Sequence, residues 1–590
     1  MSSSVNHYRV AAIQFEPRLG AKAENIARLL ELTETAARQD ARLIVLPEMA
    51  TTGYCWYDRE EIRPHVEPIP GPTTAIFGDI ARHFGCYVVV GMPEVVPRTG
   101  IFYNSAVLVG PAGVVGVYRK THSYAADMKW AKDGDLGLPV WQTELGRIGI
   151  MICMDAGYFE PARLLALAGA DVLCFPTNWL GEKSPGPAWI TRAYENGCYL
   201  VGANRYGLER GVQFSGGSCV LNPDGTIQAA QDIDDGIVYG DVSLATARAK
   251  SFGVGMLAEK LSARRPELYD NLTLSNYLWN PLEFHGLYNH QPLPPGRRSL
   301  ATVAQIAPRP GDCVGNFALL EQAFADMSEP SEFRDQADVD LIVFPEYALT
   351  GCPTAERLDI ALSNEEALAW HGRLVELTQR YDTYMVVGYA EQFRGQIFSA
   401  ALLAGPDGVL AIYHKTHIVG AETAWCSRGS EKPPVINLPL GRVGLLIGTD
   451  LCFPEPARTL AIAGCDLIAV AAGPGLPPLQ RGELTRLPLK PPGIAAADPY
   501  HFHLARQRAF ENNCYLAFAS LPPPQGIGCS SIFGPDPIYR TDEKVLDADE
   551  GLVVSAIDTT NFDMLYPSSP VRIKELVRMR QTQLYDELQI

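Results

Sequence analysis

The sequence lacks several features that would place it in common classes of protein. No stretch contains the roughly 18 consecutive apolar residues that a membrane-spanning helix needs. The amino terminus has no basic region followed by an uninterrupted apolar core, so no export signal is predicted. The 13 cysteines form no CxxC pair, which argues against a zinc or dithiol redox site. We therefore expect a cytoplasmic protein that does not bind membranes and holds no metal.

Positive charge is also scarce. The chain has 49 Lys and Arg residues against 67 Asp and Glu residues, a formal net charge of −18, and no segment in which basic residues cluster. Such a charge repels phosphate backbones, so nucleic-acid binding is not expected. Hydrophobic residues make up 47% of the chain and charged residues 20%, as is usual for globular proteins. The 590 residues are therefore enough for more than one domain with a sizeable core.

What the sequence does contain is an internal repeat. Residues 146–175 and 441–470 align without a gap and are identical at 14 of 30 positions. The two copies differ in chemistry at the eighth position, where the first has Cys153 and the second has Gly448. The repeat predicts two related domains joined by a Pro-, Asn- and His-containing linker: residues 1–272, 273–298 and 299–590.

Each half mixes strand-length apolar runs with helical periodicity. Residues 43–46 and 87–90 are continuous apolar runs that are typical of buried strands, whereas apolar residues recur at helical spacing over 26–37. Residues 106–109 and 114–118 flank a Gly-Pro-Ala-Gly turn and predict an antiparallel hairpin. The pattern therefore predicts a mixed α/β fold.

Three residues with reactive side chains follow strand-like runs in the first half: Glu48, Lys120 and Cys153. The ends of strands are where α/β proteins usually place reacting groups. A thiol at a strand-to-helix turn can attack a carbonyl carbon if a base takes its proton, and backbone N–H groups of the turn can stabilise an oxyanion. Taken singly, each residue is more simply explained as surface charge or as a core filler.

The second half keeps two of the three residues. Glu346 lies 298 residues after Glu48. Lys415 lies 295 residues after Lys120, which is also the spacing between the cysteine and its glycine counterpart. The agreement of the three spacings indicates one working site in the first half and a remnant without a nucleophile in the second.

Together these motifs resemble the carbon–nitrogen hydrolase (nitrilase) superfamily, whose members have a Glu, a Lys and a Cys in this chain order. The resemblance covers both halves. It implies two tandem α-β-β-α sandwich domains, packed as an intramolecular pseudo-dimer because relatives commonly pair through a helical face. It also implies that Glu48 is the general base, that Cys153 attacks the carbonyl carbon, and that Lys120 and the backbone N–H of Met154 stabilise the oxyanion. No metal or organic cofactor is implied.

The resemblance leaves two neighbouring residues open. Asp127 stands where the family usually has a second glutamate, as the second half does with Glu422. Its shorter side chain either positions Lys120 or the substrate, or belongs to an exposed loop. His122 could act as a base, but His417 is kept in the half without the thiol, so a structural role is expected for both histidines.

Four further residues are expected to bind the substrate, because they occupy segments that line pockets in relatives: Tyr54, Tyr124, Asn178 and Trp179. The residues after the cysteine, Met154 and Asp155, resemble amidases more than true nitrilases, in which a Trp and a Glu typically follow. We expect hydrolysis of a non-peptide C–N bond of a small linear amide through a thioester acyl-enzyme, with release of ammonia or an amine.

Several alternatives stay open at this point. They are a true nitrilase, a glutaminase that feeds ammonia to a partner, an N-carbamoyl amino acid hydrolase with Arg205 as its carboxylate clamp, and a non-catalytic interaction scaffold. The expected partner is a small-molecule amide, and homo-oligomers of the pseudo-dimeric chain are also considered.

Overall fold

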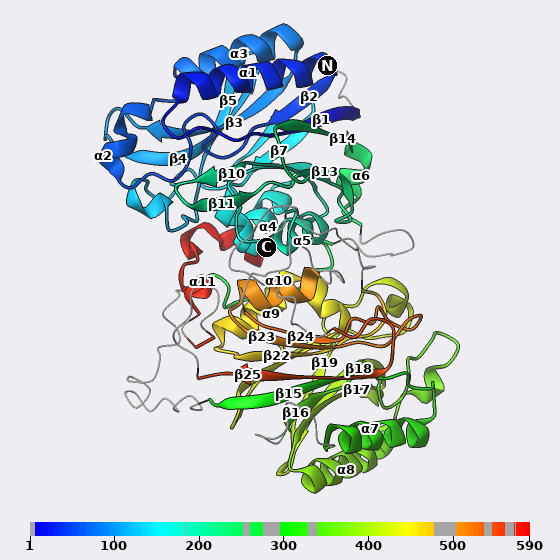
Figure 1. Ribbon diagram of the computed structural model, residues 1–590. Helices are drawn as coiled ribbons and strands as arrows, with labels where there is room; N and C mark the ends of the chain where they lie inside the picture. Colours follow the sequence, from blue (N-terminus) through cyan, green and yellow to red (C-terminus); the bar gives the residue numbers. More distant parts are fainter. Residues whose placement is uncertain are drawn as a thin grey trace.

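The computed structural model describes most of the chain as two similar halves (Figure 1). The described residues are 6–182, 184–251, 260–274, 296–328, 339–476, 503–535, 545–560, 571–572 and 574–590. Each half has two sheets that face each other between layers of helices, which confirms the predicted α/β sandwich. Most of the predicted linker over 273–298 lies outside the described residues, and the domain boundaries stay predictions.

The outer sheet of the first half has the strand order β14-β1-β2-β3-β4-β5. Its strands are β1 (His7–Gln14), β2 (Ala41–Val45), β3 (Tyr87–Val95), β4 (Phe102–Gly110), β5 (Gly113–Arg119) and β14 (Gly236–Ser243). The outer face packs against α1 (Lys22–Arg38) and α3 (Pro72–Phe84) (Figure 1). β4 and β5 pair antiparallel, so the predicted hairpin is confirmed.

The inner sheet has the order β13-β12-β9-β8-β7-β6 and faces α4 (Phe159–Leu167) and α5 (Pro187–Asn196). Its strands are β6 (Val140–Thr143), β7 (Gly146–Ile150), β8 (Val172–Thr177), β9 (Tyr199–Asn204), β12 (Ser218–Leu221) and β13 (Ile227–Gln231). β7, β8 and β9 run parallel. These strands are buried on both faces, which explains why they read as continuous apolar runs rather than alternating ones.

The second half repeats this architecture. Its outer sheet, β19-β18-β17-β16-β15-β25, comprises β15 (Arg298–Gln305), β16 (Val339–Val343), β17 (Tyr384–Phe393), β18 (Gln396–Gly405), β19 (Gly408–His414) and β25 (Gly551–Asp558). Its inner sheet comprises β20 (Val435–Leu438), β21 (Gly441–Ile447), β22 (Leu467–Ala471), β23 (Tyr515–Ala519) and β24 (Ser531–Phe533). The helices are α7 (Cys313–Ser328) and α8 (Asn364–Tyr381) outside, and α9 (Pro454–Ile462) and α10 (His503–Glu511) inside.

Short elements complete the described parts of the fold. They are α2 (Arg59–Ile62), α6 (Leu244–Ala249), α11 (Glu575–Arg578), and the ribbon of β10 (Tyr206–Glu209) and β11 (Val212–Ser215). Among the described helices, none combines the length and the apolar character needed to cross a bilayer.

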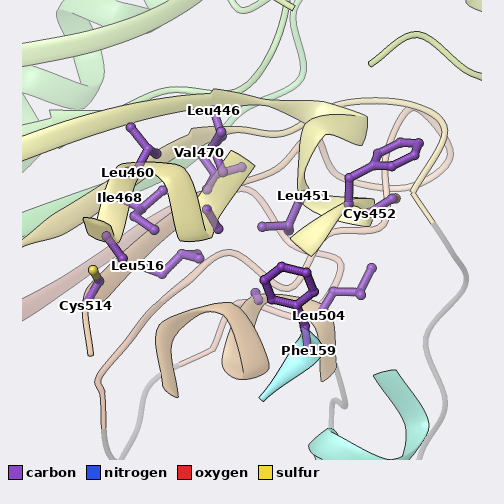
Figure 2. Packing of buried hydrophobic residues seen from close by; sticks show 14 of the residues in the cluster. Phe159, Leu446, Leu451, Cys452, Leu460, Ile468, Val470, Leu504, Cys514 and Leu516 are labelled. Carbon is purple, nitrogen blue, oxygen red and sulfur yellow. The ribbon is translucent and has the colours of Figure 1, made fainter. Parts of the chain in front are cut away.

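The two halves meet through their inner helices (Figure 1). Phe159 at the start of α4 points into an apolar cluster made mostly by the second half (Figure 2). Buried ion pairs cross the boundary reciprocally: Arg192 pairs with Glu511, and Arg508 pairs with Glu195 at 2.6 Å. The two halves are therefore joined by equivalent ion pairs, while the pseudo-dimer packing stays a prediction.

Candidate functional site

The ends of three strands bring the predicted acid, amine and thiol together in the first half. Glu48 follows β2, Lys120 follows β5, and Cys153 opens the 3-10 turn η3 (Cys153–Gly157) after β7. Lys120 Nζ lies 2.7 Å from Glu48 Oε1, and all three side chains are buried. The charges of Glu48 and Lys120 both act on the pKa of the Cys153 thiol, which places the thiol beside the pair.

Asp127 belongs to this site rather than to an exposed loop. It is fully buried, and its Oδ2 lies 2.6 Å from Lys120 Nζ. Asn104 of β4 donates hydrogen bonds to both carboxylates, at 2.7 Å to Glu48 and at 3.0 Å to Asp127. The exposed-loop alternative for Asp127 is therefore wrong, because its side chain is buried and pairs with Lys120. Sequence reasoning missed Asn104, although the polar pair Asn104-Ser105 at the start of the apolar run of β4 was a signal.

Burial sets the protonation of the three groups. It raises the pKa of Glu48, and the Lys120 ammonium and the Asn104 hydrogen bond only partly oppose this shift. Burial would lower the pKa of Lys120, but the charges of Asp127 and Glu48 outweigh it and hold that pKa well above its usual range. Burial and the Glu48 charge raise the pKa of the Cys153 thiol to about 12. The thiol is thus neutral at neutral pH and needs a base during attack, while Lys120 stays an ammonium.

The turn that carries the thiol has an unusual backbone. Cys153 has a φ of 45°, in the left-handed region that non-glycine residues rarely adopt. Asp155 holds the turn in place by accepting a hydrogen bond from the Ile152 N–H at 2.8 Å. Gly448 in the second half has the same φ of 45°, so the two turns share one conformation. Strained backbone of this kind persists where the surroundings fix it, and it is frequent at active sites.

Buried polar atoms with unused hydrogen-bonding capacity lie near the thiol. Within the described part of the chain, neither Glu48 Oε2 nor the two side-chain amide atoms of Asn178 has a hydrogen-bond partner. The Asn178 backbone N–H lies close enough to the Cys153 thiol to lower its pKa, which places Asn178 beside the site. Buried polar groups are normally satisfied, so unsatisfied ones mark a place for a ligand or water.

Two of the three predicted aromatic residues, Tyr54 and Tyr124, contact Asp127. Tyr54 places its OH 3.4 Å from Asp127 Oδ2, and the Lys120 ammonium lies 5.8 Å from its ring centroid. Tyr124 donates its backbone N–H to Asp127 at 2.9 Å. Trp179, next to Asn178 at the end of β8, is half-buried and donates its indole N–H to Glu182.

Two residues have side chains committed elsewhere. The Met154 side chain packs with Tyr158 and Phe510 toward the second half. The oxyanion role predicted for its backbone N–H stays a prediction. Arg205 ion-pairs with the buried Glu209 at 2.7 Å and stacks on Phe214. Its charge is therefore already compensated, which argues against the carboxylate clamp considered for it.

His122 is not placed to act as the base. Its Nδ1 lies 3.1 Å from Asp155 Oδ1, and its Nε2 lies 2.9 Å from the OH of Tyr585. Both ring nitrogens are engaged, in agreement with the structural role expected for this residue. The described residues also contain no group of three or more His, Cys, Asp or Glu side chains that could hold a metal ion.

In the corresponding site of the second half, other side chains lie where the thiol would be. Lys415 again lies between two carboxylates, at 3.0 Å from Glu346 and 2.5 Å from Glu422. A Cβ atom added at Gly448 would lie only 2.4 Å from Glu346 Oε2 and 2.8 Å from Lys415 Nζ. Gly473 stands where the first half has Asn178. The remnant has thus lost both its nucleophile and the space that a nucleophile would need.

Comparisons with known proteins match each half separately. The model of the carbon-nitrogen hydrolase family matches residues 9–251 and 300–542. A nitrilase of Pyrococcus abyssi is 37% identical over 264 residues, which cover 44% of this chain and 98% of that protein. An N-carbamoylputrescine amidase of Solanum lycopersicum is 29% identical over 287 residues, covering 44% of this chain and 93% of the relative. The crystal structure of an amidase from Nesterenkonia sp. matches with 25% identity and a TM-score of 0.38, covering 46% of this chain and 97% of that one.

Proposed function

The chain belongs to the carbon-nitrogen hydrolase family, and from that premise we propose that its first half hydrolyses the C–N bond of a small linear amide through Cys153. One observation carries the proposal. A neutral thiol, a buried carboxylate and an ammonium meet at Cys153, and the carboxylate keeps Glu48 Oε2 without a partner among the described residues. That oxygen is free to receive a proton.

The proposed reaction proceeds in two covalent steps. Glu48 takes the thiol proton as Sγ of Cys153 attacks the amide carbonyl carbon, and the oxyanion forms beside Lys120 and the backbone N–H of Met154. The C–N bond then breaks, and the leaving nitrogen takes the proton from Glu48 and departs as ammonia or an amine. Glu48 next removes a proton from water, whose oxygen attacks the thioester. The carboxylic acid leaves, and the proton returns to the Cys153 thiolate.

Lys120 suits the oxyanion role because two carboxylates keep it charged. Its ammonium lies 2.7 Å from Glu48 and 2.6 Å from Asp127, so it is fixed before the substrate binds. Charges that are already oriented stabilise a developing oxyanion without reorganisation. Asp127 is therefore proposed to position Lys120 rather than to touch the substrate. No metal or organic cofactor takes part in this proposal.

Substrate binding is proposed to involve the residues around this centre. The amide atoms of Asn178, which have no partner in the described part of the chain, would accept and donate hydrogen bonds to the substrate amide. Tyr54, Tyr124 and Trp179 would contact an apolar or aromatic acyl group. Residues of these types are the usual lining of small-molecule sites, where a few polar groups set orientation.

The rival functions are weaker on the same observations. An N-carbamoyl amino acid would bring a carboxylate, and Arg205 is already paired with Glu209. A true nitrilase keeps support from the Pyrococcus abyssi relative, and product analysis separates it from an amidase. A non-catalytic scaffold leaves the buried Glu48–Lys120–Cys153 arrangement without a use of its own. A glutaminase that serves a partner would use the same three residues, but the two matches to the family model occupy residues 9–251 and 300–542 and leave little of the chain for a synthetase domain. A cytoplasmic location and homo-oligomers of the chain stay predictions.

The proposal is tested with the full-length protein and a panel of amides, N-carbamoyl amines and nitriles. Ammonia release is measured, and intact-protein and peptide mass spectrometry locate the acyl group. We expect turnover of at least one amide and an acyl adduct on Cys153, both absent in Cys153→Ala. The matched control is Cys452→Ala, which removes a buried thiol from the corresponding turn of the second half and should keep wild-type turnover. Turnover that survives in Cys153→Ala would refute the mechanism.

A further inference from the structure

The ends of the two halves cross over and reach into each other. Tyr585, close to the carboxyl end of the chain, places its OH 2.9 Å from His122 Nε2 in the first half. Tyr269, at the end of the described part of the first half, places its OH 2.5 Å from His417 Nε2 in the second half. All four residues are buried, and Figure 1 shows the carboxyl terminus between the halves, beside α4.

The exchange is symmetric over the whole segment. A spacing of 316 residues separates Tyr269 from Tyr585 and also separates Arg264 from Arg580. Arg580 donates to Glu160 of α4 at 2.8 Å, and Arg264 donates to Glu455 of α9 at 2.9 Å. Each tail is therefore held by a buried ion pair on the opposite half. The structural equivalent of Arg580 is thus Arg264.

Hydrogen bonds connect Tyr585, through His122 and Asp155, to the turn that carries Cys153. Asp155 accepts a hydrogen bond from the His122 backbone N–H at 3.0 Å, and its Oδ1 lies 3.1 Å from His122 Nδ1. A carboxylate can only accept, so Nδ1 carries the proton of this bond. In the neutral imidazole Nε2 is then an acceptor, and the Tyr585 OH donates to it. Asp155 therefore fixes the tautomer, and the Tyr585 hydroxyl holds the orientation of the His122 ring, against which the Tyr158 ring also stacks with the centroids 4.1 Å apart.

Asp155 in turn holds the turn that presents the thiol. It lies two residues after Cys153 and accepts the Ile152 N–H at 2.8 Å and the Tyr118 OH at 2.7 Å. These hydrogen bonds therefore hold Ile152 and Asp155, which lie on either side of Cys153 in the chain. Because Cys153 has a φ of 45°, its position depends on this fastening. A loosened His122 would let Asp155, and with it the thiol, move relative to Glu48.

We propose that Tyr585 is a positioning residue for the first-half site, so that the tail of the thiol-free half completes the active site. The inference rests on the proposed amidase function. The proposal gives the second half a function, although the site of that half has no nucleophile. Tyr269 makes the same bond to His417, but the turn that His417 supports carries Gly448, so that contact serves no reaction.

This asymmetry supplies the matched experiment. Tyr585→Phe and Tyr269→Phe each delete one buried hydroxyl from equivalent contacts in the full-length protein. We expect the two variants to shift the urea unfolding midpoint by similar amounts. Tyr585→Phe should lower kcat for the best amide by at least about tenfold with KM nearly unchanged, because the nucleophile rather than the substrate is displaced. Tyr269→Phe should keep kcat within about twofold of wild type, because the turn that His417 supports carries no nucleophile to displace.

A second pair of variants guards against misfolding of Tyr585→Phe. His122→Asn should lower kcat, as Tyr585→Phe does, whereas His417→Asn should leave kcat unchanged, as Tyr269→Phe does. Equal kcat values within both pairs, whether unchanged or lowered together, would overturn the positioning role. A wild-type protein that releases no ammonia and acquires no acyl group on Cys153 would instead refute the proposed function itself. Formation of the acyl-enzyme in single-turnover experiments provides a further readout, and we expect it to slow only in the first member of each pair.

Discussion

Placing a cysteine at Gly448 is expected to damage the second half without creating a second active site. Although the backbone there has the same φ of 45° as Cys153, the side chain would enter occupied space. Its Cβ would meet Glu346 Oε2 at 2.4 Å and Lys415 Nζ at 2.8 Å. Both atoms end buried side chains that form an ion pair with each other, so making room for the thiol requires this pair to shift in packed surroundings.

The cost has two parts. A non-glycine residue in the left-handed region costs roughly 1–2 kcal/mol. Forcing a side chain into a packed interior costs roughly 1–3 kcal/mol more. Gly448→Cys should therefore lower the free energy of unfolding by about 2–5 kcal/mol. Gly395 separates the two parts, because it has a φ of 77° with no atom within 4 Å of an added Cβ. Gly395→Cys should lose only the backbone part, roughly 1–2 kcal/mol.

Urea unfolding of both variants measures these losses, and amide turnover is measured with each substitution placed in a Cys153→Ala protein. We expect no turnover above that of Cys153→Ala alone. The reasoning would be refuted by measurable turnover from Cys153→Ala/Gly448→Cys, since the remnant would then still have room for a nucleophile. It would also be refuted if Gly448→Cys were no less stable than Gly395→Cys.

Three further predictions concern charge. Asp127→Asn should lower kcat by roughly 10- to 100-fold because Lys120 loses a carboxylate that positions it. The matched variant in the second half, Glu422→Gln, should leave kcat unchanged. Equal effects of the two variants on ammonia release would contradict the positioning role of Asp127. Because burial raises the pKa of Glu48 above the ordinary 4.5, kcat/KM should rise with pH through a value above 4.5, and a limb at or below 4.5 would exclude Glu48 as the base. Burial would raise the pKa of Glu511, but Arg192 and Arg508 lower it from 4.5 to about 2. Ionised Glu511 therefore stabilises the folded protein by about 3 kcal/mol, fully above about pH 4.5 and progressively less as the pH falls toward 2. The urea unfolding midpoint of the wild type should fall over this pH range, and that of Glu511→Gln should lack this loss.

Much of the site could be predicted because each motif is local. Glu48, Lys120 and Cys153 follow apolar runs whose length and composition indicate buried strands, and strand ends are where α/β proteins usually place reacting groups. Glu48 and Lys120 follow strands of the outer sheet and Cys153 follows a strand of the inner sheet, so the facing of the two sheets brings them together. The second copy of the pattern showed that the thiol position is the one that changed. The α/β layers follow from the same local periodicity.

Contacts between distant segments could not be predicted in this way. Asn104 bridges two carboxylates only because β4 lies beside both the strand end that carries Glu48 and the 3-10 turn Asp127–Lys129 that carries Asp127. Whether Asp127 was buried, and whether Gly448 left a cavity, depended on how side chains from several elements fill one space.

The sequence by itself determined the duplicated α/β pattern, the three reactive positions of the first half and the absence of a thiol in the second. Only the tertiary structure decided that the remnant is closed and that Tyr585 meets His122 from the other half of the chain. The physical reason is that periodicity and spacing report what a residue does within its own element. Hydrogen bonds and steric exclusion between residues hundreds of positions apart depend on the packing of the whole molecule.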